Sequence, residues 1–213
     1  MSVKRTAIAA VLACVAGLGA AHTATDGFEA FTLESARRLS ALRASARVPD
    51  LALELADGGR ARIGEMPARV LLVDFIYTRC ASACTALGSV YARLQERLAA
   101  EIAAGEVRLV SVSFDPKHDG PGELRAYRSR HSSDPAGWEL GRTVDANELR
   151  DALEAFGVVV IPDRLGGYVH NAAVHVVGPE RTLLAIFDPE DMDGIVRRAR
   201  DVTGRTAAHV ATR

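Results

Sequence analysis

The sequence predicts an α/β domain whose core is a parallel β-sheet with helices on both faces. Residues 70–77, VLLVDFIY, form an apolar, β-rich run of the kind found in buried strands. Apolar residues then recur at helical spacing over 83–103, and a second apolar strand follows at 107–114. Two strands joined through a helix form a βαβ unit, which makes the strands parallel and covers the sheet with helices.

The other predicted elements share one signal, an apolar run bounded by turn or helix-capping residues. They are, in chain order, a hairpin from 51–55 around Asp57-Gly58-Gly59, a short helix that starts at Pro121 and carries Leu124 and Tyr127, a short strand at 138–140, a helix that starts at Asp145 and Glu148 with capping-box spacing, an extended segment at 158–161, a hairpin of 172–177 with 182–187 around Gly178-Pro179, and a last helix at 190–202. This order, with antiparallel strands added at its end, matches a thioredoxin-like sheet plus an N-terminal hairpin.

The composition is that of an ordinary globular protein. The chain has 213 residues, of which 48% are hydrophobic and 25% charged, and its formal net charge is −1. These values exclude bulk disorder and a fibrous chain. The balanced charge gives no general attraction to phosphate backbones, so we expect no nucleic-acid partner. Three cysteines are too few for a disulfide scaffold.

The first 21 residues are typical of a secretory signal. A basic start with Lys4 and Arg5 precedes 16 uncharged residues at 6–21, which end in small residues. This run is shorter than the about 18 residues expected of a membrane-spanning helix, and cleavage after Ala21 fits it. An uncleaved short anchor and lipidation of Cys14 are the two alternatives.

The rest of the chain divides into three predicted parts. Residues 22–47 form a linker or tether, with a loose amphipathic helix over 26–46. Residues 48–203 form the globular domain, and residues 204–213 form a frayed tail. Export places the domain in the periplasm or another extracytoplasmic space. Membrane contact is expected only through an N-terminal anchor.

Cys80 and Cys84 are the residues best suited to chemistry. They follow the strand at 70–77 where the helix at 83–103 begins, and their spacing places both sulfurs on one face. The positive potential of a helix N-terminus lowers a thiol pKa. The pair can close a disulfide or bind a soft metal ion, whereas zinc lacks a second Cys or His pair nearby. A plain stabilising disulfide is the alternative without chemistry.

His170, in GGYVHNAAVHVV, is the candidate for a third ligand. It lies in a loop two residues before the strand at 172–177. In thioredoxin-type sheets this loop faces the cysteine turn, and oxidoreductases of that fold carry a cis-proline in it. Residues 169–171 take that place here, and no proline lies between Arg164 and Gly178. Two thiolates and an imidazole form a soft ligand set that favours Cu(I) and can adapt to Cu(II).

The remaining histidines and two aspartates are weaker candidates for the site. We expect His175 at a packed or edge position in its strand, and His118 in a solvated loop from which it could reach the metal. We expect His131 and His209 at the surface. Asp115 and Asp119 are expected either to line the rim of the site or to cap the start of the Pro121 helix.

Three segments in order resemble the Sco/SenC family of copper chaperones. DFIYTRCASAC resembles the family's strand followed by Cys-x3-Cys, and VSVSFDPKHDGPGELRAY resembles its second strand, Asp-Pro loop and helix. GGYVHNAAVHVVGP resembles the segment with the ligand histidine, and His170 keeps the family spacing of nine residues to Pro179. The likeness extends over about 48–200. The family commonly has Pro after each motif cysteine and Asp before the histidine, where this chain has Ala81, Thr85 and Val169.

The resemblance implies a thioredoxin-like fold and one copper ion bound by Cys80, Cys84 and His170. It also implies a copper chaperone that delivers copper to the CuA centre of cytochrome c oxidase. The partner is then the oxidase copper-site subunit or another copper chaperone. The alternative is a thiol–disulfide oxidoreductase in which Cys80 attacks and Cys84 resolves. His170 and the missing proline favour the chaperone, and no peroxidase cysteine motif is present.

Overall fold

The computed structural model describes residues 3–44, 47–80, 83–164 and 166–210. The chain divides into two compact units, Met1–Ala44 and Ser45–Arg213, which we call the N-terminal unit and the main domain. Four parts of the chain remain predictions: a signal over 1–21, a linker over 22–47, a domain over 48–203 and a tail over 204–213.

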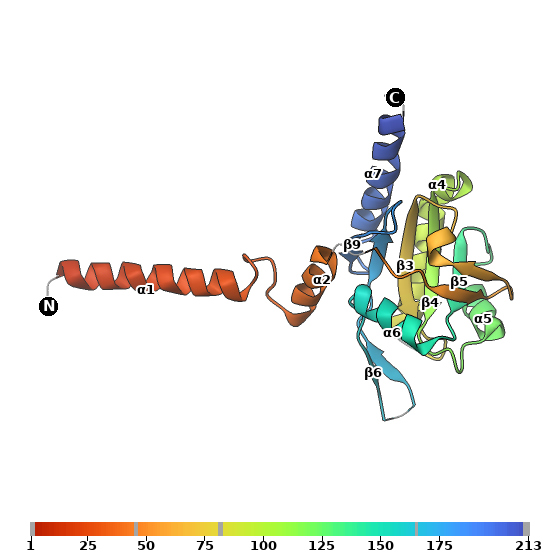
Figure 1. Cartoon of the computed structure of the whole chain (residues 1–213), viewed down its shortest axis with the longest axis horizontal. Helices are drawn as coiled ribbons and strands as arrows, with labels where there is room; N and C mark the ends of the chain where they lie inside the picture. Colours follow the sequence, from red (N-terminus) through yellow and green to blue (C-terminus); the bar gives the residue numbers. More distant parts are fainter. Residues whose placement is uncertain (1–2, 45–46, 81–82, 165, 211–213) are drawn as a thin grey trace. The chain divides into compact units, whose positions relative to one another are not determined.

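The N-terminal unit consists of two helices, α1 (Val3–Ala24) and α2 (Leu33–Arg43) (Figure 1). Within α1, the stretch Arg5–Ala24 is long and apolar enough to cross a membrane, a test that a signal sequence near the N-terminus also passes. The helix therefore extends past the 16-residue run. Thr23 lies in its last turn and donates its hydroxyl to the Ala20 carbonyl, 3.0 Å away.

The helix predicted over 26–46 is shorter in the structure. Asp26, Gly27 and Phe28 have φ values of 50°, 77° and 68°, in the left-handed region that a right-handed helix excludes. The helix begins only after Thr32, whose side chain accepts a hydrogen bond from the Ser35 N–H at 3.0 Å and caps the first turn.

The main domain is built on a seven-stranded mixed sheet in the order β2-β1-β5-β4-β3-β8-β9. Its central pairs, β3 with β4 and β4 with β5, are parallel, and the other pairs are antiparallel. The strands are β1 (Ala52–Leu55), β2 (Arg60–Arg62), β3 (Val70–Ile76), β4 (Val107–Ser113), β5 (Trp138–Arg142), β8 (Val174–Val177) and β9 (Leu183–Phe187). The predicted α/β sheet and both of its hairpins are confirmed.

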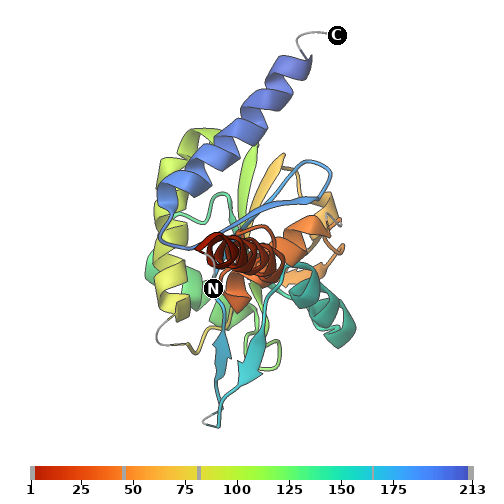
Figure 2. The same ribbon diagram turned by 90° about the vertical axis from the view of Figure 1, so that its left-hand side faces the viewer.

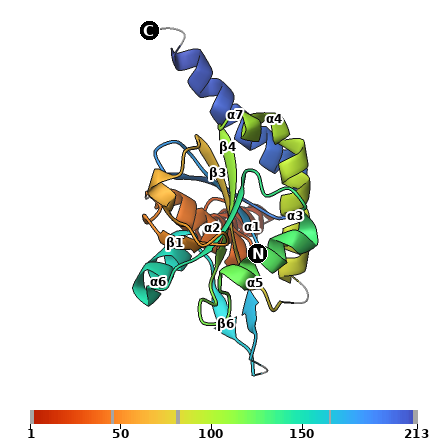
Figure 3. The ribbon, with the colours of Figure 1, turned by 90° about the vertical axis from the view of Figure 1, so that its right-hand side faces the viewer.

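Helices cover both faces of the sheet, as the sequence predicts. Figure 3 shows α3, α5 and α7 on one side and α6 on the other, and Figure 2 gives the same separation from the opposite direction. All residues of β3 are buried between these layers. The helices are α3 (Ala83–Arg97), α4 (Ala99–Ala103), α5 (Pro121–His131), α6 (Ala146–Ala155) and α7 (Met192–Val210), with a 3₁₀ turn at Ile63–Glu65.

The prediction of a single helix over 83–103 is wrong, because the helix is interrupted at Leu98. Leu98 has φ −109° and ψ 19°, outside the helical region, while its side chain is fully buried. Arg200 of α7 compensates for the break. Its guanidinium donates to the Arg97 carbonyl at 2.9 Å and to the Glu101 carboxylate at 2.5 Å. A contact from a distant helix thus replaces a hydrogen bond that the continuous helix would make.

One other helix boundary and one helix cap differ from the prediction. The last helix, α7, continues to Val210 rather than ending at 202. No proline follows Pro189, and Gly204 alone costs a helix only about 1 kcal/mol. At α6, Asp145 caps the helix by accepting from the Asn147 and Glu148 N–H groups. The second half of the capping box does not form, because the Glu148 carboxylate instead accepts from the Ala52 N–H of β1 at 3.1 Å.

A two-stranded ribbon of β6 (Val160–Pro162) and β7 (Tyr168–His170) projects beyond the main sheet (Figure 1). The prediction of a loop around His170 is therefore wrong in part, since His170 ends strand β7 and pairs with Val160. The ribbon forms because Asp163 accepts a hydrogen bond from the Gly167 N–H at 2.7 Å across its turn.

Candidate metal centre

The centre lies at the carboxyl end of β3. Cys80 follows this strand, Cys84 lies in the first turns of α3, and His170 comes from the ribbon. The Cys84 sulfur is 3.4 Å from Nε2 of His170. The Cys84 N–H points to the Cys80 sulfur, with 3.4 Å between nitrogen and sulfur. The fold thus brings together the three residues singled out from the sequence, and both cysteines are free thiols.

The electrostatics of Cys84 differ from the expectation that a helix N-terminus lowers the thiol pKa. Burial raises the pKa of Cys84 well above its ordinary value, and a hydrogen bond from the Tyr77 N–H, 3.5 Å from the sulfur, offsets this only in part. The expectation is wrong for this cysteine because its side chain has lost water, which stabilises a thiolate. A cation at the sulfur would restore the thiolate by displacing the proton.

His170 lies against aromatic rings. Its ring centre is 5.0 Å from that of Phe114 and 6.3 Å from that of Tyr77. Burial lowers the pKa of His170, which favours the neutral imidazole that binds metals. Among the described residues, Nδ1 of His170 is buried without a hydrogen-bond partner. Val169, the residue before His170, is 64% exposed.

A hydrogen-bond network that sequence reasoning missed holds the chain just before Cys80. Asp119 is fully buried and accepts from the Thr78 N–H at 2.9 Å, the Thr78 hydroxyl at 2.6 Å and the Ser113 hydroxyl at 2.6 Å. Asp119 therefore does not cap α5, whose N-cap is Gly120 without a side-chain bond. Its place after β4, parallel to β3, is the one sequence signal for this role.

Asp115 performs a second positioning role beside Asp119. Its carboxylate accepts from Arg79 at 2.7 Å and lies 2.8 Å from Nδ1 of His118. Burial alone would raise the pKa of Asp115, but the hydrogen bonds from His118 and Arg79 outweigh burial and keep the pKa below its usual range. His118 is thus bound to Asp115 at the rim, and the structure of the described residues shows no hydrogen bond from it to either cysteine.

The other histidines are accounted for by packing. His175 is buried in β8, where its ring nitrogens lie 3.0 Å from the carbonyls of Val73 and Phe156, as expected of a packed histidine. His131, expected at the surface, is half-buried there, with its ring above Gly88 of α3, where an added Cβ would lie 2.4 Å from it. The side chain of His209 lies outside the described residues, as do Ala81 and the side chain of Thr85.

Asp74 is an unexpected buried carboxyl in the middle of β3. It is fully buried, and neither of its oxygens has a hydrogen-bond partner of good geometry within the described chain. Burial raises the pKa of Asp74 to about 7, although the nearby hydroxyls of Ser111 and Tyr91 counteract part of this effect. The sequence alone shows a single Asp within an apolar run and gives no sign of this shift.

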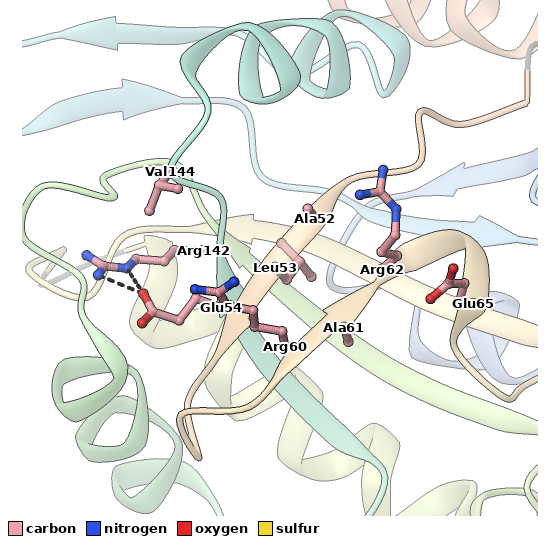
Figure 4. Close-up of a pocket in the computed structure, with 9 residues that line it drawn as sticks. All are labelled: Ala52, Leu53, Glu54, Arg60, Ala61, Arg62, Glu65, Arg142 and Val144. Atoms are coloured by element: carbon pink, nitrogen blue, oxygen red, sulfur yellow. Dashed lines mark hydrogen bonds and ion pairs between the residues drawn. The ribbon is translucent and has the colours of Figure 1, made fainter.

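A surface pocket elsewhere on the main domain contains none of these residues. It lies over β1, β2 and β5, which β4 separates from β3 in the sheet. Figure 4 shows one ion pair among its lining residues, between Arg142 and Glu54 at 2.7 Å. Arg62 turns to Asp50 at 2.6 Å. The residues that line the pocket include no cysteine or histidine, so it is separate from the candidate metal centre.

The donor atoms of the centre fit a soft metal ion. Two sulfurs and one imidazole nitrogen suit Cu(I) better than hard cations, which prefer oxygen. Within the described residues, no three His, Cys, Asp or Glu side chains stand as a ready-made metal site.

A thioredoxin-like fold with two cysteines at the end of a central strand and a histidine against one of them defines a thiol-based metal-binding or redox protein. The family model described as SCO1/SenC matches residues 44–203. The chain therefore belongs to the SCO1/SenC family, which confirms the resemblance of the three sequence segments.

Individual relatives agree with this assignment. The chain is similar to the SCO1 protein homolog of Bacillus subtilis (strain 168), with 28% identity over 134 residues, 62% of this chain and 68% of the relative. Its fold is similar to that of BsSco, a member of the Sco family of cytochrome c oxidase assembly proteins, with a TM-score of 0.65, 23% identity and coverage of 75% and 95%. It is also similar to Arabidopsis thaliana ScoI with copper bound, with a TM-score of 0.62, 17% identity and coverage of 73% and 99%.

Proposed function

We propose that this protein binds one copper ion through Cys80, Cys84 and His170 and delivers it to the CuA centre of cytochrome c oxidase. The observation that carries the proposal is the 3.4 Å contact between the Cys84 sulfur and Nε2 of His170, two atoms from separate elements. This sulfur and this imidazole nitrogen are two of the three ligand atoms of the proposed soft metal shell. The similarity to a copper-bound Sco structure and to an oxidase assembly protein supports the same role.

The chemistry of delivery follows from the exposure of the two thiols. Cys84 is buried, whereas Cys80 is partly accessible and can meet an incoming ligand. Copper would pass to the partner by stepwise ligand exchange, in which a partner thiol or imidazole replaces one ligand at a time. The protein would act outside the cytoplasm, where α1 serves as an export signal or an anchor. Its partner would be the copper-site subunit of the oxidase or another copper chaperone.

A copper titration and X-ray absorption test this function directly. The reduced protein is expected to bind one Cu(I), with two sulfurs and one nitrogen around the metal. A shell of four sulfurs, or of nitrogens alone, would reject the ligand set.

Oxidation gives an independent test of the thiols as ligands. Closing a disulfide between Cys80 and Cys84 is expected to abolish Cu(I) binding, since the thiolates and not a disulfide are the ligands. The measurement is a Cu(I) titration of fully oxidised protein, with the re-reduced sample as control. Equal stoichiometry and affinity in the two samples would show that copper binds elsewhere.

The second candidate function is a thiol–disulfide oxidoreductase acting on the cysteines of a copper-site partner. The observation that favours it is the pair of free thiols with unequal exposure, the more accessible Cys80 and the buried Cys84. In that reaction the Cys80 thiolate attacks a partner disulfide and releases one partner thiol. Cys84 then attacks Cys80, which frees the second partner thiol and leaves a Cys80–Cys84 disulfide.

A further inference from the structure

The ribbon of β6 and β7 carries an apolar pair on its outer side. Ile161 and Val169 are directly opposite one another in the register and are 56% and 64% exposed. In the described part of the main domain, the only other large hydrophobic side chain with such exposure is Val144. Exposed apolar side chains that are adjacent on a rigid element are typical of interaction surfaces.

The inner side of the same ribbon covers the metal centre. Side chains alternate along a strand, so Tyr168 and His170 point away from the side that Val169 occupies. The Tyr168 ring lies 5.3 Å from that of Tyr77 and 5.5 Å from that of Phe114, which fixes the ribbon against the domain. A molecule bound to the Ile161–Val169 pair would thus lie one residue from a copper ligand.

Three exposed cations belong to segments next to the cysteine side of the centre. Arg79, Lys117 and Arg130 are exposed there, whereas the nearby carboxylates of Asp115 and Asp119 are buried. The Asp115 carboxylate binds the Arg79 guanidinium. Lys117 lies in the sequence between Asp115 and Asp119. We call Arg79, Lys117 and Arg130 the cationic rim. It is local, because the whole chain has a formal net charge of −1.

Contacts of Arg130 and of Tyr168 place one cation of the rim and the ribbon next to the same centre. Arg130 reaches the Thr78 carbonyl at 3.4 Å, two residues before Cys80, and lies over the Tyr127 ring at 5.4 Å. On the ribbon side, the charges of Asp115 and Arg79 are close enough to Tyr168 to affect its pKa. An incoming ligand therefore reaches the metal centre past a cationic group on one side and an apolar pair on the other.

We propose that the Ile161–Val169 pair and the cationic rim form the docking surface for the copper acceptor, a protein domain that presents carboxylates around an apolar contact. The inference rests on the proposed function, since copper exchange needs the partner's ligand atoms at the centre itself. Opposite charge on the acceptor would steer the encounter, and the apolar pair would hold the complex. Two apolar side chains are a small area for insertion into lipid, so a protein occupant fits the surface better.

The test measures copper transfer from the full chain loaded with one Cu(I). The acceptors are the copper-free CuA domain of the oxidase subunit from the same organism and, separately, the small chelator bicinchoninate. One variant carries Ile161→Ser with Val169→Ser, and another carries Lys117→Glu with Arg130→Glu. Arg79 is left intact because it binds Asp115 beside Cys80. The matched controls are Val144→Ser and Arg197→Glu, which alter exposed side chains outside the surface.

Both surface variants are expected to slow transfer to the CuA domain by about 10-fold or more, with transfer to the chelator within about twofold of wild type. The controls should match wild type with both acceptors. Transfer by wild type should also slow as salt is raised, and this dependence should weaken in the charge variant. Equal Cu(I) affinity and equal thermal unfolding of all variants show that the centre and the fold are intact.

The outcomes separate the docking surface from the function on which it rests. If wild type gives copper to the chelator but not to the CuA domain, the proposed delivery is wrong. If wild type supplies the domain and both surface variants supply it equally fast, only the docking surface is wrong. Variants with unchanged transfer but weaker binding to phosphatidylglycerol vesicles than the Val144→Ser control would assign the surface to a membrane instead.

Discussion

Replacing His170 with Ala is expected to lower the affinity for Cu(I) by about 100-fold or more, because the variant loses a direct ligand. Loss of a group that merely orients a ligand already costs about 10–100-fold. Thiol–disulfide exchange should change by less than about tenfold, since the sulfurs carry that reaction and the imidazole can only adjust their pKa. The two effects together separate a copper chaperone from a disulfide reductase.

The measurement pairs Cu(I) competition against a chelator with reduction of a small model disulfide, both on the same variant. His118→Ala is the matched control, because His118 is another histidine close to Cys80 in the fold but is bound to Asp115. It should leave the copper affinity within about threefold of wild type. Wild-type affinity together with collapsed reductase activity in His170→Ala would replace the chaperone with the oxidoreductase.

Replacing Asp74 with Asn is expected to make the protein more stable above pH 7 and to remove a pH dependence. In wild type, burial raises the pKa of Asp74 from 3.8 to about 7. The folded state therefore holds a proton that the unfolded state has lost between these values, so stability falls as pH rises through this window. Above pH 7 this pKa difference lowers the free energy of unfolding of wild type by about 4 kcal/mol, and below pH 4 the loss vanishes.

Denaturant unfolding of reduced protein from pH 4 to pH 8 measures this effect as the difference between variant and wild type. The groups around Asp74 are Tyr91, Tyr127 and Cys84, whose pKa values burial raises, so none of them titrates in this window. Asp201→Asn, on the exposed side of α7, removes the same charge without burial and is the control. A difference between Asp74→Asn and wild type that stays constant with pH would contradict the prediction.

The parts of the fold that the sequence predicts well are those with local causes. The alternation and turn residues of 51–59 produce the first hairpin, and the apolar runs at 70–77 and 107–114 become the parallel strands β3 and β4. The break at Leu98 escapes sequence analysis because it depends on Arg200, about 100 residues away. Local helix propensity continues through that position, and tertiary contacts override it.

The candidate site divides in the same way. The motif spacing and the family resemblance identify Cys80, Cys84 and His170, and the fold places Cys84 against His170. The environment of these residues is not visible in the motif. The pKa of Cys84 rises because of burial, and the bonds of Asp119 to Thr78 join positions 41 residues apart. Such terms arise only when separate elements pack together.

Two residues that flank the cysteine motif are held by side chains from distant parts of the chain. Asp119 accepts hydrogen bonds from the amide and hydroxyl of Thr78, and the Tyr127 hydroxyl donates to the Cys84 carbonyl. Backbone that folding has already fixed loses less conformational entropy when a ligand binds beside it. For the copper site proposed above, Thr78 and the Cys84 backbone would therefore take little of the metal's binding free energy for their own ordering.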